Sequence, residues 1–289
     1  MSTTADSYYI PHGTRWPIIG SIGLVTSAVG FANYLHGSSF IMTAIGLGII
    51  IFMMWGWFGQ VVKESLDGKY NAQVDMSFRW GMGWFIFSEV MFFAGFFGAL
   101  FYARELSIPW LGGASNNVAT HDLLWPNFQA TWPLIQVPLA DKFDVARQTV
   151  GAWGLPAINT VILLTSGVTV TWAHHALKKN NRTGLITGLA LTVALGFLFV
   201  GLQAYEYSHA YSELNLKLTS GIYGSTFYML TGFHGFHVTM GAIMLTVILI
   251  RSIKGHFTPE HHFAFEAVAW YWHFVDVVWL GLFIFVYWL

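Results

Sequence analysis

Seven apolar stretches recur along the chain, and short polar segments separate most of them. A helix needs about 20 predominantly apolar residues to cross the hydrocarbon core of a bilayer, and each stretch is of that length. The pattern therefore predicts an all-α membrane protein. Its seven transmembrane helices are expected at 16–34, 40–62, 78–104, 156–177, 183–207, 221–250 and 263–289.

The connections between these stretches divide the chain into two parts. The turn near residues 36–39 is so short that the first two helices, within 16–62, should form an antiparallel hairpin. A polar segment, 63–77, leads to the other five helices, within 78–289. The segment from about 105 to 148 is rich in Pro, Trp, Asn and Asp, and it predicts a long, partly helical loop on the membrane surface, where tryptophan is favoured.

The distribution of Lys and Arg predicts the orientation of the chain. With segment 1–15 in the cytoplasm, nine Lys and Arg residues lie on that side and four on the other. This arrangement obeys the positive-inside rule, and it also places segment 63–77 in the cytoplasm and the C-terminus on the opposite side. Segment 1–15 lacks the basic region and the cleavage site of a signal peptide, so we expect it to be retained.

Composition supports a membrane protein and excludes several functions. Hydrophobic residues make up 55% of the chain and charged residues only 9%, against about 25% charged residues in soluble domains. The net charge of −1 and the lack of a basic cluster exclude nucleic acid as a partner. Because the chain has no cysteine, any metal or cofactor would need histidine or carboxylate ligands.

Glu89 is the one charged residue between Arg79 and Arg104. This run spans about 36 Å as a helix, so the carboxyl group should lie well below the lipid headgroups. A carboxyl group at that depth is costly unless it is protonated or paired, and it marks a proton-related site. The alternative is a neutral Glu89 that holds helices together through the Ser88 hydroxyl or a backbone carbonyl.

Other titratable residues are concentrated in the last two apolar stretches. Glu266, His273 and Asp276 are separated by seven and three residues, so they share one helix face. His234 and His237 are three apart in the preceding stretch. Such residues can ligate a metal or carry protons. Helical carboxylate metal sites draw ligands from several helices, however, so we expect these residues to fasten helices and not to bind a metal.

Several long segments resemble subunit III of the haem-copper cytochrome c oxidases. They are FIFSEVMFFAGFFGALF around Glu89, LTSGVTVTWAHHAL at 164–177, GLQAYEY at 201–207, YGSTFYMLTGFHGFHVTMGA, and HHFAFEAVAWYWHFVDVVWL at 261–280. The resemblance covers essentially the whole chain. The presence of the N-terminal hairpin favours a cytochrome c oxidase, because quinol oxidase relatives generally lack these two helices.

The resemblance implies a non-redox accessory subunit of a proton-pumping oxidase in aerobic respiration. In this family the hairpin and the five-helix bundle form a V that holds phospholipids, and the subunit packs against subunit I. Haem a and copper belong to subunits I and II, and cytochrome c is the electron donor. This chain is expected to carry no cofactor and no catalytic residue. It would support proton uptake by subunit I and protect the enzyme during turnover.

The resemblance also assigns site residues. Glu89 matches the buried membrane carboxylate of the family, and Glu64, Arg251, Lys254 and His256 match positions near lipid headgroups. Basic groups at helix ends attract anionic headgroups, although a snorkelling helix end is the simpler alternative. The loop at 105–148 is much longer than the corresponding loop of mitochondrial members. It suggests an aa3-type oxidase of a bacterial inner membrane, with that loop and the C-terminus in the periplasm.

Two other function classes remain open from the residues alone. The chain could be a stand-alone proton or ion transporter that uses Glu89, Glu266 and Asp276. It could also be an enzyme with a histidine-ligated haem or metal. A pure chain without visible absorption or metal would contradict the second of these.

Overall fold

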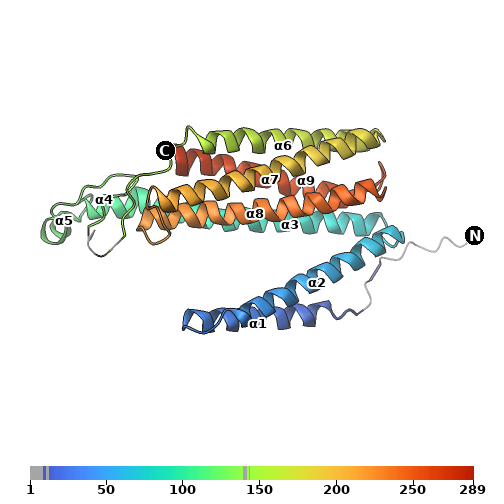
Figure 1. The fold of residues 1–289 in the computed structure, drawn as a ribbon, viewed down its shortest axis with the longest axis horizontal. Helices are drawn as coiled ribbons and strands as arrows, with labels where there is room; N and C mark the ends of the chain where they lie inside the picture. The colour runs from blue at the N-terminus through green and yellow to red at the C-terminus, as the bar shows by residue number, and fades with distance from the viewer. Residues whose placement is uncertain (1–8, 11–12, 139–141, 143) are drawn as a thin grey trace, which may run out of the picture. The chain divides into compact units, whose positions relative to one another are not determined.

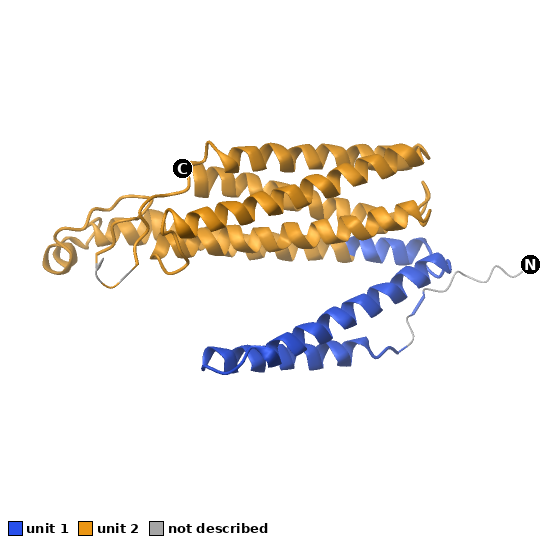
Figure 2. Ribbon diagram, viewed as in Figure 1, with its two compact units in different colours: residues 1–80 blue, residues 81–289 orange. Residues whose placement is uncertain are grey.

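The computed structural model describes residues 9–10, 13–138, 142 and 144–289, and every regular element in these residues is helical. Seven helices are long and apolar enough to cross a membrane, which confirms the predicted all-α, seven-helix membrane protein. The chain consists of two compact units, residues 1–80 and residues 81–289 (Figure 2). Most of the expected N-terminal segment 1–15 lies outside the described residues.

The first unit contains an antiparallel hairpin of α1 (Trp16–Leu35) and α2 (Ile41–Leu66) (Figure 1). Small residues let the two helices approach closely: a Cβ atom on Gly30 would lie only 2.5 Å from the backbone nitrogen of Thr43. The indole of Trp16 donates a hydrogen bond to Gln60 at 2.9 Å and links the open ends of the hairpin. The hairpin therefore depends on backbone contact at one end and a polar link at the other.

The expected cytoplasmic segment 63–77 is mostly helical, and its position relative to the membrane stays a prediction. Helix α2 continues to Leu66 and α3 (Ala72–Phe101) begins six residues before the expected Phe78, so only residues 67–71 lie between them. The Asn71 side chain accepts from the Val74 amide at 3.0 Å, and Arg79 pairs with Asp75 at 2.7 Å. Capping and an i,i+4 ion pair stabilise a polar first turn that hydropathy alone leaves outside the helix.

The second unit is a bundle in which α6 (Leu155–Lys178), α7 (Arg182–Ser212), α8 (Ile222–Ile253) and α9 (Phe263–Leu282) run side by side with most of α3 (Figure 1). A π-helical turn, η2 (Phe283–Trp288), ends the chain. Buried Trp272 and Trp279 of α9 fill the bundle interior. Their indoles donate to Ser166 and Thr160 of α6 at 2.8 and 2.9 Å, so α9 is both packed and hydrogen-bonded.

The segment expected as a loop at 105–148 is partly helical, as predicted. Helical structure continues from α3 through a π-helical turn, η1 (Tyr102–Ser107), into α4 (Ile108–Leu111), and α5 (Val118–Leu124) follows. Irregular chain then leads to α6. Asp144 accepts hydrogen bonds from Lys217 at 2.7 Å and Asn215 at 2.6 Å, which lower the pKa of that carboxyl group and tie the loop to the bundle.

Gly30→Ala should loosen the hairpin, because the added methyl group meets the backbone of α2, which cannot rotate away as a side chain can. Overpacking of this kind costs about 1–3 kcal/mol. We expect a lower thermal midpoint for the purified protein in mild detergent. Gly48→Ala is the matched control, since a Cβ atom there meets nothing within 4 Å. Equal midpoints for the two variants would contradict the close approach.

Candidate functional site

Glu89 of α3 and His237 of α8 form the central polar contact of the bundle. Glu89 Oε2 lies 2.8 Å from His237 Nε2, and the two side chains are only 21% and 9% exposed. Sequence reasoning offered Ser88 as a partner for Glu89, but the Ser88 hydroxyl donates to the Phe85 carbonyl at 2.7 Å. The partner is a histidine from a distant part of the chain, 148 positions away.

The other ring nitrogen of His237 fixes how this contact is protonated. Nδ1 lies 2.6 Å from the Phe233 carbonyl oxygen, which can only accept, so Nδ1 carries a hydrogen. A close approach of Nε2 and Oε2 then requires one proton between them. Either a neutral carboxyl group donates to the imidazole, or an imidazolium donates to a carboxylate. In both cases the pair is neutral overall, which removes most of the cost of burying Glu89.

Aromatic rings enclose the pair. The rings of Phe92 and Phe93 lie 5.8 and 5.0 Å from the His237 imidazole, and Tyr271 of α9 stacks on its face at 6.3 Å. The Tyr271 hydroxyl also donates to the backbone carbonyl of His237 at 3.3 Å. This packing holds the imidazole in one orientation and keeps the effective dielectric constant around the shared proton low.

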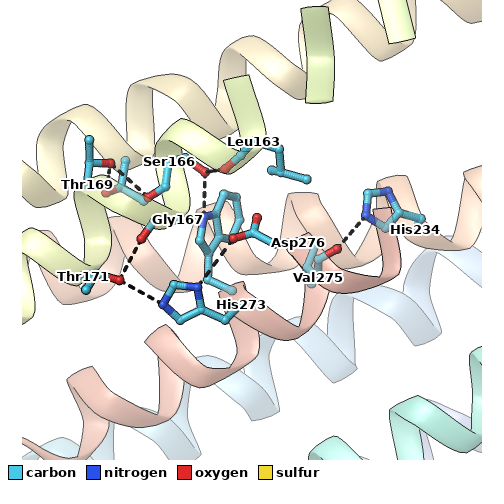
Figure 3. Close-up of polar contacts among 11 residues, drawn as sticks. Leu163, Ser166, Gly167, Thr169, Thr171, His234, His273, Val275 and Asp276 are labelled. Carbon is cyan, nitrogen blue, oxygen red and sulfur yellow. Dashed lines mark hydrogen bonds and ion pairs between the residues drawn. The ribbon is translucent and has the colours of Figure 1, made fainter. Parts of the chain in front are cut away.

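A second polar cluster joins α6 and α9 (Figure 3). His273 Nδ1 lies 3.6 Å from Asp276 Oδ2, and its Nε2 lies 3.2 Å from the Thr171 hydroxyl of α6. The Asp276 carboxyl group rests against Gly167. His234 of α8 is fully enclosed and donates from Nε2 to the Val275 carbonyl at 3.2 Å. Each of these side chains thus contacts a second helix or a residue that does.

The third cluster combines His262 and Glu266 of the α9 N-terminus with His174 near the end of α6. Glu266 Oε1 lies 3.4 Å from Nε2 of each histidine, and the two Nε2 atoms are also 3.4 Å apart. His174 was not among the sequence candidates. Two histidine pairs in the sequence could have indicated it. His174 and His175 lie near the C-terminal end of one apolar stretch, and His261 and His262 lie just before the start of a stretch that runs antiparallel to it.

Sequence reasoning also missed Glu206 of α7, whose side chain is 1% exposed. Its Oε1 accepts from the Tyr287 hydroxyl at 2.7 Å and from the Gln203 amide at 3.1 Å. The spacing of three residues between Gln203 and Glu206 on a helix was the available signal. The partner Tyr287 belongs to η2, and its proximity could not be read from the sequence.

The headgroup residues assigned by resemblance lie at the end of α8. Arg251 is buried, and its guanidinium lies 4.6 Å from the centre of the Phe257 ring. Within the described residues, Arg251 Nε, Ser252 Oγ and His256 Nδ1 are buried atoms without a hydrogen-bond partner. Burial and the charges of Arg251 and Lys254 lower the pKa of His256 below its usual 6.5. In the part of the chain that the structure describes, Arg251 Nε and Ser252 Oγ therefore lack an acceptor.

Glu64, the fourth assigned residue, lies in the first unit. Gln60 donates to its Oε1 and the Tyr70 hydroxyl to its Oε2, both at 2.9 Å. Burial and this bond raise the pKa of the Tyr70 phenol, so the phenol stays a donor. Glu64 is thus held by its own unit, and its lipid contact stays a prediction.

Comparison with known proteins decides the family. The family model described as cytochrome c oxidase subunit III matches residues 6–289. The chain belongs to the cytochrome c oxidase subunit III family. It is 40% identical over 289 residues to cytochrome c oxidase subunit 3 of Carassius auratus and of Squalus acanthias, covering 100% of this chain and 99% of each relative. The subunit 3 of Tetraodon nigroviridis is 41% identical over the same span.

Membership of the subunit III family confirms the resemblance found in the sequence and makes this chain an accessory part of an oxidase complex in the membrane. The Glu89–His237 pair joins two of the segments that carried the resemblance, FIFSEVMFFAGFFGALF and YGSTFYMLTGFHGFHVTMGA. The third cluster likewise joins the segments at 164–177 and 261–280. The distinctive parts of this subunit III sequence are therefore the parts that meet in space.

His237→Leu should destabilise the bundle by about 1–3 kcal/mol, because it leaves the Glu89 carboxyl group without its partner in an apolar setting. The measurement is the thermal midpoint in mild detergent, with His209→Leu on the exposed side of α7 as the control. The double variant Glu89→Leu/His237→Leu should recover much of the loss, since removing both partners of a buried pair is nearly neutral. A double variant that is less stable than the single one would contradict the shared-proton pair.

Proposed function

We propose that this subunit III is a non-redox accessory subunit that sustains proton uptake by subunit I of a proton-pumping cytochrome c oxidase. The observation that carries the proposal is the Glu89–His237 pair, which holds one proton between two groups inside the membrane. Haem a and copper are assigned to subunits I and II, with cytochrome c as the donor. Subunit I is the main contact.

The pair suits a proton-related role better than simple fastening. Fastening requires only a fixed hydrogen bond, which a serine or an amide would provide. A carboxyl group beside an imidazole can hold the same proton on either atom at no net change in charge. Movement of that proton within the pair therefore costs less desolvation energy than forming an isolated charge, which is a property required of a proton-handling group in a bilayer.

The geometry argues against a stand-alone transporter that uses Glu89, Glu266 and Asp276 in sequence. Each carboxyl group has a different histidine partner: His237 for Glu89, His262 and His174 for Glu266, and His273 for Asp276. The three form separate clusters: that of Glu89 joins α3 to α8, and those of Glu266 and Asp276 join α6 to α9 around different histidines. A relay needs its members within hydrogen-bond reach of one another or of shared water.

Glu89→Gln should leave assembly intact and the first turnovers of oxygen reduction within about twofold of wild type, or about 0.4 kcal/mol in activation free energy. The amide preserves shape and can still donate to His237, but it cannot release a proton. Proton uptake during sustained turnover should fall. Oxygen consumption and proton uptake are measured together in reconstituted vesicles.

Glu105→Gln, on the exposed turn η1, is the matched control for Glu89→Gln and should behave as wild type. Loss of the first turnovers in Glu89→Gln would contradict a supporting role. Unchanged proton uptake with lower stability would instead leave Glu89 as a helix fastener.

The end of α8 supports a second part of the proposal, binding of an anionic phospholipid headgroup by Arg251, Lys254 and His256. The donors at Arg251 Nε and Ser252 Oγ are buried without an acceptor in the described residues. A phosphate oxygen would supply that acceptor, and the positive residues would attract it. The same proposal includes three further predictions: this end of α8 faces the cytoplasm, the protein lies in a bacterial inner membrane, and its helices form a V that holds lipid.

Arg251→Ala/His256→Ala should reduce the phospholipid retained by the purified oxidase and shorten its active lifetime. Retained lipid is counted by mass spectrometry after a fixed detergent wash. Lys179→Ala removes an exposed charge at the same end of the bundle and should change neither quantity. Equal lipid content in the wild type, the double variant and Lys179→Ala would contradict the assignment of these residues to a lipid headgroup.

Binding of the anionic lipid should tighten as the pH falls below 6.5. The pKa of lipid-free His256 lies below that value, and a bound phosphate would raise it, so binding takes up a proton. The measurement is retention of anionic lipid as a function of pH, and the change should disappear in His256→Ala. A pH-independent retention in the wild-type protein would show that His256 does not face the headgroup.

A further inference from the structure

We propose that His174, His262 and Glu266 form a binding site for a divalent cation of the zinc class. The site would join the C-terminal end of α6 to the N-terminal end of α9. It is distinct from the Glu89–His237 pair, and it does not depend on the proton-uptake role.

The spacing of the three candidate ligand atoms is the first argument. Glu266 Oε1 and the Nε2 atoms of His174 and His262 are mutually 3.4 Å apart. Such separations are long for a hydrogen bond, whose usual range is about 2.7–3.2 Å. They match the distance of about 3.4 Å between ligand atoms placed tetrahedrally around Zn²⁺ at 2.0–2.1 Å. One ion can therefore contact all three atoms without rearrangement.

The protonation of His262 is the second argument. Its Nδ1 lies 3.1 Å from the Thr258 carbonyl oxygen, which can only accept, so Nδ1 carries the hydrogen. The Nε2 of a neutral His262 then presents a lone pair to the centre of the cluster. A backbone carbonyl that fixes the tautomer in this way is the usual outer partner of a metal-bound histidine.

The rigidity and access of the site are the third argument. Phe265, which is almost fully buried, packs against the His174 ring at 5.3 Å, and His262 meets the same ring edge-on at 5.4 Å. The side chains of His174, His262 and Glu266 are 23%, 8% and 12% exposed. The ligands are thus held in place, and the partial exposure of His174 leaves the cluster open to solvent.

The donor set selects the class of ion. Two imidazoles and one carboxylate suit zinc, whereas magnesium and calcium prefer oxygen ligands alone. Sequence reasoning expected no metal because helical carboxylate sites draw such ligands from several helices, and only one spacing of that kind appears in the chain. His174 supplies the ligand from a second helix that this reasoning lacked, which is the arrangement that helical metal sites use.

The test uses the intact purified oxidase, treated with a chelator and then equilibrated with Zn²⁺ at buffered free concentrations. We expect His174→Gln, His262→Gln and Glu266→Gln each to lose one zinc equivalent, with affinity lowered by more than about 100-fold, since loss of an outer partner alone costs about 10–100-fold. The neighbouring histidines give matched controls: His175→Gln and His261→Gln should bind as wild type. Bound zinc is counted by elemental mass spectrometry.

A second measurement uses the wild-type protein alone, so it applies even if a variant fails to assemble. Diethyl pyrocarbonate modifies neutral imidazoles, and peptide mass spectrometry distinguishes His174 from His175. Zinc should protect His174 from modification. It should not change the modification of His175 and His261, which are exposed. Equal binding by the ligand and control variants, or equal modification of His174 with and without zinc, would overturn the site and leave a cluster held by protons alone.

Discussion

In a bilayer, a buried polar side chain cannot turn to water, so its partner must come from its own helix or from a neighbouring one. The five-helix bundle follows this constraint. Trp272 and Trp279 of α9 donate to hydroxyl groups of α6, and Tyr271 donates to the backbone of α8. The Glu89–His237 contact joins α3 to α8 under the same rule. Apolar side chains are as well solvated by lipid as by a neighbouring helix. The polar contacts therefore specify which helices become neighbours.

The same constraint explains the charge state of the bundle interior. A carboxyl group that meets an imidazole can become neutral by sharing a proton, and the tautomer of His237 requires that one proton be present. Asp276 is in a different situation, because its histidine partner is 46% exposed and 3.6 Å away. Of these two carboxyl–imidazole contacts, the Glu89 pair alone combines a short distance with aromatic rings around the imidazole. A proton held there lies between two largely buried side chains, and either of them can carry it.

Much of the fold could be predicted from the sequence, because hydrophobic length sets the spans and small residues set the hairpin. Glu89 stood out for the same reason, as a single charge in an apolar run. Its partner could not be assigned, since the period of a helix relates residues three or four apart and not 148 apart. Glu206 was missed because it lies close to the end of its span, where a charge is ordinary, and its burial depends on Tyr287 from the last turn of the chain.

The ends of the helices obey a different rule, because water and ions reach them. At the end of α8, Arg251 Nε and Ser252 Oγ are buried without an acceptor in the described residues, which is the basis of the proposed headgroup site. At the ends of α6 and α9, two imidazole nitrogens and a carboxyl oxygen lie 3.4 Å from one another, which is longer than the usual hydrogen bond. Protons therefore suffice in the middle of this bundle, whereas its ends carry the polar groups on which the proposed headgroup and cation sites rest.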